Sequence, residues 1–232
     1  MGQAASPVRA PGEVSVAGAL LMTAVGGFID AYLFLRHGVF AFAQTGNVVF
    51  LAVAVVQGRT WTIYLWPILA YITGLIVAQV LRWARPALPS SWILAILIGQ
   101  IVVFAVLAAL PASAGALGFV VPLAFIGGIR LDLFRSAGGS SFVSIATTGN
   151  LMRFVQSVAT AARDHTAIQW RAASTTGLVV VAFVAGAFAG AGASALGPHA
   201  LWGAVILELV ALVIYASTSW RAIRLSGREP RV

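Results

Sequence analysis

Six apolar stretches, each long enough to cross a lipid bilayer as a helix, limit how this chain can fold more than any other feature. A membrane-spanning helix needs about 20 apolar residues, and the 232-residue chain is 60% hydrophobic with a mean hydropathy of +0.98. Only 9% of its residues are charged, against about a quarter in a soluble domain. The six stretches are roughly 15–35, 61–83, 92–110, 115–135, 172–195 and 200–220.

Other features of the sequence support an all-α, polytopic helical membrane protein. The seven tryptophans fall near the ends of the six stretches, as an interfacial aromatic belt requires. The net charge of +8 comes from arginines at the ends of apolar stretches, so we expect contacts with membrane lipids and no nucleic acid. The chain has no cysteine, and its three histidines lack metal-ligand spacing. We therefore expect no metal, no cofactor and no enzymatic activity.

A single transmembrane domain is predicted over residues 15–220, between a polar tail at 1–14 and a basic tail at 221–232. Within it, two further segments, 38–57 and 138–162, each contain the tripeptide Thr-Gly-Asn, and neither resembles an ordinary lipid-facing span. Both segments could cross the membrane, which makes eight spans, or both could turn back as re-entrant segments beside six spans. The arginines divide eight to four between the two sides with eight spans, and ten to two with six.

The positive-inside rule favours six spans and two re-entrant segments. Either arrangement places the N- and C-termini in the cytoplasm. We therefore expect a multi-pass protein of the cytoplasmic membrane.

The two halves of the chain, 15–110 and 115–220, share one layout. AVGGFIDAYLFLR at 24–36 and AFIGGIRLDLFRS at 124–136 each carry a diglycine with charges near the end, followed by a loop, the tripeptide and two full spans. Because three spans are an odd number, the second half would enter the membrane from the opposite face. This predicts a 3+3 inverted repeat, which is a common plan among secondary transporters.

The stretch GGFIDAYLFLRHGVFAFAQTGNVVFLAVAV, with GGIRLDLFRSAGG and TTGN in the second half, resembles the YoaK family of bacterial integral-membrane proteins. The resemblance covers about residues 15–218. Where the family usually has a Gln-Asn pair in its second half, this chain has Arg130 and Leu131. The resemblance implies a helical membrane fold and a role in small-molecule transport without an assigned substrate.

Each tripeptide suits the start of a half-length helix inside the membrane. Glycine permits a bend, and Thr or Asn can cap the helix that follows. Such a helix directs free N–H groups and the positive end of its dipole into the protein, which suits an anion or a carboxylate. In the alternative interpretation, the two glycines only allow helices to pack closely. The predicted substrate-binding residues are Asp30, Gln44, Thr45, Gly46, Asn47, Thr148, Gly149, Asn150 and Arg153.

Ionisable residues inside the predicted spans and segments are costly and are therefore candidates for function. Asp30 with Arg153, or with Arg130, would form a neutral buried pair. Arg130, Asp132 and Glu208 are either coupling charges or structural ones, and Glu208 needs a partner from elsewhere in the chain or a proton. An aspartyl pair of Asp30 and Asp132 would suit an intramembrane hydrolase, but the usual glycine-flanked protease motif is absent.

The leading hypothesis is a transporter or channel for a small polar or anionic solute whose identity the sequence leaves open. The alternative is a non-transporting membrane scaffold whose polar residues lock helices together, and a distant alternative is an intramembrane hydrolase. A homo-oligomer is compatible with each. Gly186 and Gly190, in an alanine-rich stretch, predict a tightly packed helix face in every case.

Overall fold

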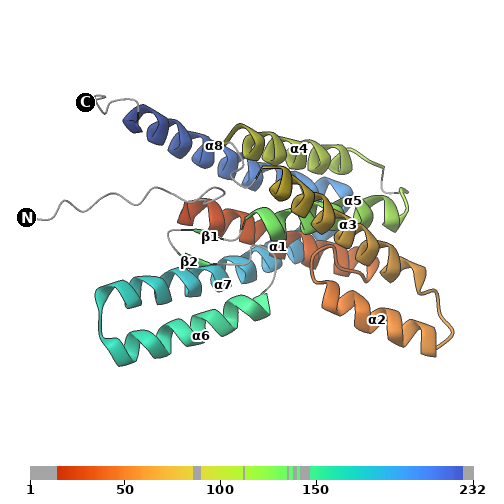
Figure 1. Ribbon diagram of the computed structural model, residues 1–232. Helices are drawn as coiled ribbons and strands as arrows, with labels where there is room; N and C mark the ends of the chain where they lie inside the picture. Colours follow the sequence, from red (N-terminus) through yellow and green to blue (C-terminus); the bar gives the residue numbers. More distant parts are fainter. Residues whose placement is uncertain are drawn as a thin grey trace, which may run out of the picture.

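In the computed structural model the described chain is almost entirely helical (Figure 1). The structure describes residues 15–85, 90–111, 113–134, 136–137, 140–141 and 147–226. The predicted tail 1–14, the last six residues of the predicted tail 221–232 and most of the run from 138 to 146 lie outside the described residues.

Six long helices follow the six predicted stretches closely, and the largest difference at a helix start is at α7, which begins before the predicted 172. Within the described residues, five segments are long and apolar enough to cross a membrane, and the fifth, 167–217, contains two of these helices. The 3-10 helix η1 (Ser194–Ala200) separates those two, and Gly197 within it turns the chain with φ 63° and ψ −144°, a conformation that only glycine adopts readily. The six helices are α1 (Val16–His37), α3 (Thr62–Ala84), α4 (Ser90–Ala108), α5 (Ala116–Leu133), α7 (Ala167–Ala193) and α8 (Leu201–Ser226).

Each Thr-Gly-Asn tripeptide lies in the first turn of a further helix. These helices are α2 (Gln44–Val56), which is the shorter of the two with 13 residues, and α6 (Thr147–Asp164), with 18. At 1.5 Å per residue α2 is about 20 Å long, which is too short for a hydrocarbon core of about 30 Å. A two-residue strand pair that the sequence did not predict, β1 (Ser136–Ala137) antiparallel to β2 (Ser140–Ser141), precedes α6.

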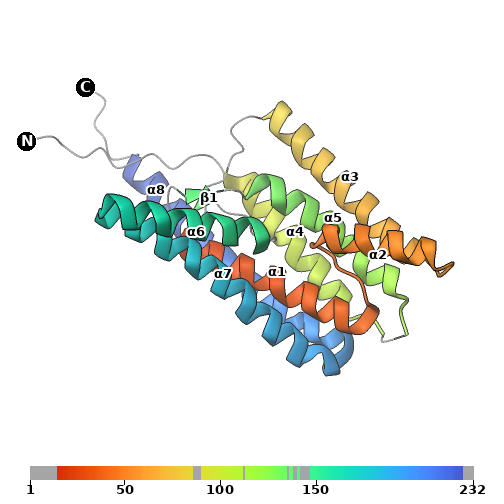
Figure 2. The ribbon, with the colours of Figure 1, turned by 90° about the horizontal axis from the view of Figure 1, so that it is seen from below.

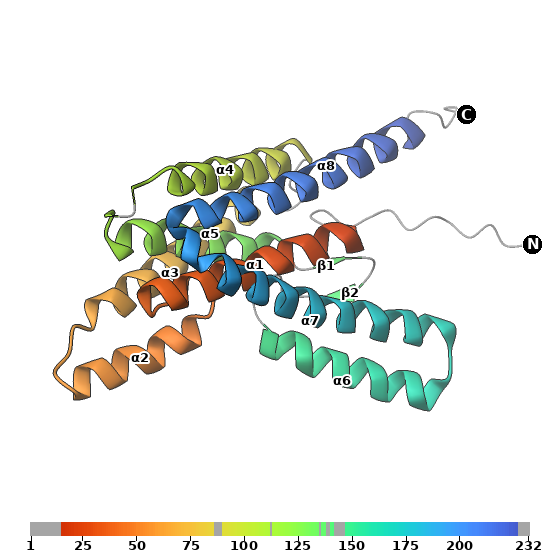
Figure 3. The same ribbon diagram turned by 180° about the vertical axis from the view of Figure 1, so that it is seen from behind.

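The chain around α2 turns back on itself. α1 ends at Gly38, whose φ of 67° lets its N–H donate to the Phe34 carbonyl oxygen at 2.8 Å. The chain then leads back toward the middle of the bundle, where α2 begins, and α2 returns to the end of the bundle at which α3 starts (Figure 2). α6 also begins near the middle and runs to the opposite end, where α7 starts (Figure 3). In all three views α2 and α6 begin close together and diverge.

Helices α1 and α7 form the most extensive contact in the bundle, and glycines allow it. A Cβ on Gly27 of α1 would overlap the Phe183 carbonyl oxygen of α7, and a Cβ on Gly186 would overlap the Ala24 carbonyl oxygen of α1. Gly190 meets a backbone carbonyl of α1 in the same way. The predicted tight packing at Gly186 and Gly190 is therefore confirmed.

Helices α3 and α5 repeat this arrangement. A Cβ on Gly74 of α3 would overlap the Phe125 carbonyl oxygen, and a Cβ on Gly128 of α5 would overlap the Tyr71 carbonyl oxygen. In both pairs each glycine meets the carbonyl of the residue three positions before the opposing glycine. Each pair also joins a helix of the first half of the chain to a helix of the second, so the two halves are interlocked.

Candidate functional site

The carboxylate of Asp30 on α1 holds the loop that leads into α2. Its Oδ1 accepts hydrogen bonds from the N–H groups of Ala41 and Phe42 at 3.0 and 2.8 Å, and its Oδ2 accepts one from Ala43 at 2.9 Å. Asp30 is 4% exposed. Several N–H donors can stabilise a buried carboxylate without a cation. The expected ion pair between Asp30 and an arginine is therefore wrong, because the returning loop brings backbone donors to the carboxylate instead.

Asn47, the last residue of the first tripeptide, ties α2 to the same loop. Its Oδ1 accepts from the Phe40 N–H at 3.0 Å, and its Nδ2 donates to the Phe40 carbonyl oxygen at 2.7 Å and to Gln44 Oε1 at 2.9 Å. Gln44 Nε2 donates to the Ala41 carbonyl oxygen at 2.6 Å. Both predicted site residues thus use their amides to hold the loop.

Thr45 and Gly46, in the first turn of α2, differ in what surrounds them. Thr45 is exposed, and within the described part of the chain its hydroxyl makes no hydrogen bond. α2 begins after Ala43 without a side-chain cap, so the expected capping by Thr or Asn is wrong for this helix. A Cβ on Gly46 would lie 2.8 Å from the Phe40 ring. Gly46 therefore permits a close approach of the loop and not of a second helix.

The second tripeptide has the same orientation as the first. Thr148 is exposed and Asn150 is buried, as Thr45 and Asn47 are. Among the described residues, a Cβ on Gly149 would meet only Arg153 Nη1, at 3.9 Å. That Nη1 is buried and has no hydrogen-bond partner within the part of the chain that the structure describes. Arg153, expected to pair with Asp30, thus lies one turn into α6 beside the helix start.

A second polar site lies in the core of the bundle. Arg130 of α5 and Glu208 of α8 are both 0% exposed, and Nη1 lies 3.0 Å from Oε2. Arg130 also contacts Gln100 Oε1 of α4 at 3.5 Å and donates through Nη2 to the Met22 carbonyl oxygen of α1 at 2.8 Å. Four helices therefore meet at one guanidinium. The sequence predicted either a partner from elsewhere in the chain or a proton for Glu208, and the structure shows a partner, Arg130. Arg130 therefore forms its ion pair with Glu208 and not with Asp30.

This cluster retains unused hydrogen-bonding capacity. Arg130 Nε, Gln100 Nε2 and Glu208 Oε1 are buried and have no hydrogen-bond partner among the described residues. Buried polar groups are nearly always paired in folded proteins. Gln100 escaped the sequence analysis, although an amide in the middle of a strongly apolar span was a usable signal.

Asp132, near the end of α5, contacts Arg82 of α3. Arg82 Nη1 lies 3.7 Å from Asp132 Oδ2 and donates to the Asp132 carbonyl oxygen at 2.9 Å. This agrees with a structural salt bridge between helices. Asp30 and Asp132 therefore have different partners, and neither contact resembles a catalytic pair of carboxyl groups.

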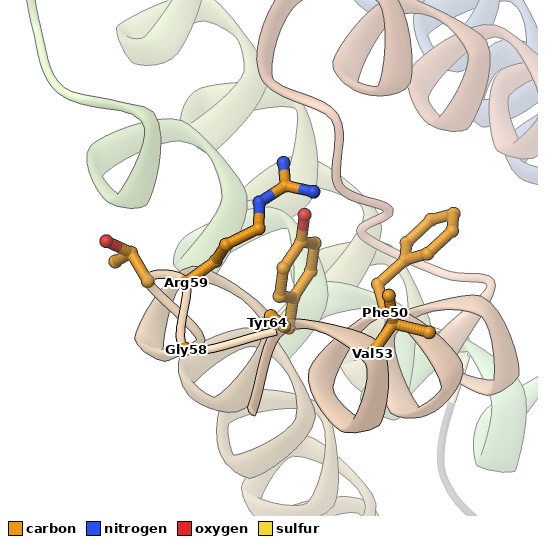
Figure 4. Close-up of a pocket in the computed structure, with 7 residues that line it drawn as sticks. Phe50, Val53, Gly58, Arg59 and Tyr64 are labelled. Carbon is orange, nitrogen blue, oxygen red and sulfur yellow. The ribbon is translucent and has the colours of Figure 1, made fainter. Parts of the chain in front are cut away.

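Two open pockets lie at the end of the bundle where α1 finishes. One, of about 530 Å³, is formed at the turn between α2 and α3, where the Arg59 and Tyr64 side chains extend in the same direction and Phe50 lies across from them (Figure 4). The other, of about 460 Å³, is lined by Arg36 together with residues of η1, including His199. Each pocket thus presents one arginine.

Together these features define a helical bundle whose apolar helices suggest a multi-pass membrane protein. Two of its helices, α2 and α6, begin inside the bundle, and the described residues include a fully buried ion pair. The chain belongs to the family described as "Protein of unknown function (DUF1275)", which matches residues 18–214. This is the YoaK family, so the resemblance noted in the sequence is confirmed. No curated protein and no solved structure matches the chain.

Proposed function

We propose that the protein is a transporter or channel for a small polar or anionic solute in the cytoplasmic membrane. In this proposal α1, α3, α4, α5, α7 and α8 span the membrane, α2 and α6 re-enter from opposite faces, and both termini are cytoplasmic. The two halves form a 3+3 inverted repeat. The crosswise packing of α1 on α7 and of α3 on α5 supports the repeat. Each pair joins the first span of one half to the second span of the other half.

The observation that carries the proposal is that α2 and α6 begin near each other in the middle of the bundle (Figures 1 and 3). Irregular backbone at membrane depth is tolerated only where protein covers it or water reaches it. Two helix starts bring two positive dipole ends to one place, with the exposed Thr45 and Thr148 hydroxyls and the unpartnered Nη1 of Arg153 beside them. These groups suit a small anion or a carboxylate.

A non-transporting scaffold is the second candidate, and one observation favours it. Three of the predicted site residues, Asp30, Gln44 and Asn47, use their polar side-chain atoms to hold the loop before α2. If every polar residue of the tripeptides served packing in this way, no ligand would be needed. We propose no enzymatic activity for either candidate.

The deciding experiment first screens purified protein by thermal shift against panels of small anions and polar metabolites, since a ligand that binds the folded state raises its melting temperature. Thr45→Val and Thr148→Val then remove the exposed hydroxyls without changing side-chain shape. Each should change the free energy of unfolding by less than about 0.5 kcal/mol and reduce the ligand-induced shift by at least half.

Thr73→Val is the matched control, because Thr73 is also exposed but its hydroxyl donates to the Leu69 carbonyl oxygen of its own helix at 2.8 Å. A wild-type shift retained by both tripeptide variants would place the ligand elsewhere. A panel in which no compound stabilises the wild-type protein would favour the scaffold.

A further inference from the structure

The buried pair of Arg130 and Glu208 is electrically neutral, and its surroundings disfavour any net charge. Both side chains are 0% exposed, and the helices that meet there, α1, α4, α5 and α8, contribute buried apolar residues to the core. An uncompensated charge in such a medium costs several kcal/mol. Arginine does not lose its proton in proteins. Glu208 is therefore the group of the pair that can change its charge.

No other charged group among the described residues is placed to balance Arg130. α8 packs on α1, α4 and η1. The carboxylate of Asp30 on α1 is held by the loop amides, and α4 carries no ionisable side chain. Arg36 and His199 line the pocket at the end of the bundle. On α5, Asp132 contacts Arg82.

The unpartnered atoms indicate what the site can receive. Glu208 Oε2 faces Arg130, whereas Oε1 has no partner and can accept a proton. Arg130 Nε and Gln100 Nε2 are donors without an acceptor, which is what an anion requires. The cluster therefore contains both an acceptor for a proton and donors for an anion.

We propose that Arg130, Glu208 and Gln100 form a site that takes up a proton and a monovalent anion together, which makes the transporter proposed above a proton–anion symporter. The proton forms an O–H bond at Glu208 Oε1 and neutralises the carboxylate. Arg130 then loses its counter-ion, and the anion replaces it by accepting hydrogen bonds from the guanidinium and from Gln100. The summed charge is zero before and after, so neither guest enters favourably without the other. This inference rests on the proposed transport function.

The site is also within reach of the loop before α2. A Cβ on Gly127 of α5 would overlap the Phe42 side chain of that loop, and Arg130 follows Gly127 by about one helical turn. Movement of the loop would therefore act directly on the helix that carries Arg130.

The test uses purified full-length protein and nitrate as the monovalent anion, exchanged against gluconate at constant ionic strength. Glu208→Gln imitates the protonated carboxyl and leaves Arg130 without a counter-ion. Its melting temperature should rise with nitrate by about 3–6 °C at ten times the dissociation constant. Wild type at pH 7.5 and the double variant Arg130→Gln/Glu208→Gln should not respond. Arg163→Gln, which changes an exposed arginine paired with Asp164, controls for nitrate binding at the surface.

A folded Glu208→Gln protein with no more nitrate response than the double variant would overturn the proposal. If Glu208→Gln is recovered only in nitrate, the proposal is supported. If it is not recovered in either salt, wild-type protein decides, because its nitrate response should grow as the pH is lowered, and a response that does not change with pH overturns the proposal. The two proposals can fail separately. If Glu208→Gln responds to nitrate while Thr45→Val and Thr148→Val keep the full ligand-induced thermal shift, the Arg130–Glu208 site is supported and the site at the starts of α2 and α6 is rejected.

Discussion

At the scale of single residues, Asp30 is the side chain on which the first tripeptide loop most depends. Asp30→Asn replaces one carboxylate oxygen by an amide nitrogen that cannot accept from a backbone N–H, so at least one of the three hydrogen bonds is lost. Hydrogen bonds to charged groups contribute about 1.5–3 kcal/mol each. We expect a loss of about 2–4 kcal/mol of unfolding free energy, measured as a lower melting temperature in detergent.

Neutralising an arginine as well should not restore this loss, because no arginine of the described ranges contacts the carboxylate. Asp164→Asn is the matched control, since Asp164 lies at the surface in a pair with the exposed Arg163, and surface ion pairs contribute about 0–1 kcal/mol. If adding Arg153→Gln raised the melting temperature of the Asp30→Asn protein back toward that of wild type, an ion pair between Asp30 and Arg153 would be supported after all.

Sequence reasoning found most of the residues that matter at this scale but few of their partners. Asp30, Arg130 and Glu208 stand out because a charge within an apolar stretch needs a reason. Their partners are a loop 11–13 residues away for Asp30 and a helix 78 residues away for the ion pair. Such pairings depend on how the helices cross, and no local pattern encodes that.

At the scale of helices, the two glycine–carbonyl crossings should be the least tolerant places in the bundle. Gly27→Ala and Gly128→Ala each place a methyl group against a backbone carbonyl, which cannot move without separating the helices. We expect each to lower the unfolding free energy by about 1–3 kcal/mol, as overpacking does. Thermal unfolding of the purified variants measures this.

Gly99→Ala on α4 is the matched control, because a Cβ there meets nothing within 4 Å. Alanine favours helix by up to about 1 kcal/mol over glycine, so this variant should be neutral or more stable. If the Gly27→Ala, Gly128→Ala and Gly99→Ala proteins were equally stable, the helices at these two crossings would lie farther apart than the structure shows.

Helix positions were predictable because hydrophobic length is a strong and local signal. α3 (Thr62–Ala84) and α8 (Leu201–Ser226) begin within one residue of the predicted 61 and 200. α7 begins five residues before the predicted 172, because its first turns, which include Gln169 and Arg171, are polar and lie outside the apolar stretch. The tripeptides predicted where α2 and α6 begin, but only α2 is about half the length of a span, because α6 continues for 18 residues. The strand pair before α6 had no signal in the sequence.

At the scale of the whole molecule, the crosswise packing of α1 on α7 and of α3 on α5 joins the two halves of the proposed repeat into one core. Because α1 packs on α7 and α5 packs on α3, neither half has a core of its own. The Arg130–Glu208 cluster lies where α1, α4, α5 and α8 meet, and so depends on both halves. A change of charge there acts on both halves at once, as a site that couples two guests to one movement requires.

Cysteine labelling can test how this molecule lies in the membrane. If α2 re-enters, Arg36 and Arg59, which flank it and are both exposed, lie on the same outer face, whereas His165, between α6 and α7, lies on the cytoplasmic face. Arg36→Cys, Arg59→Cys and His165→Cys can each be made in a chain that has no cysteine of its own. An impermeant maleimide added to intact cells should label the first two variants and not the third. Labelling of Arg36→Cys without Arg59→Cys, with lysed cells showing that both thiols react, would mean that the segment crosses the membrane and that the inverted repeat is wrong.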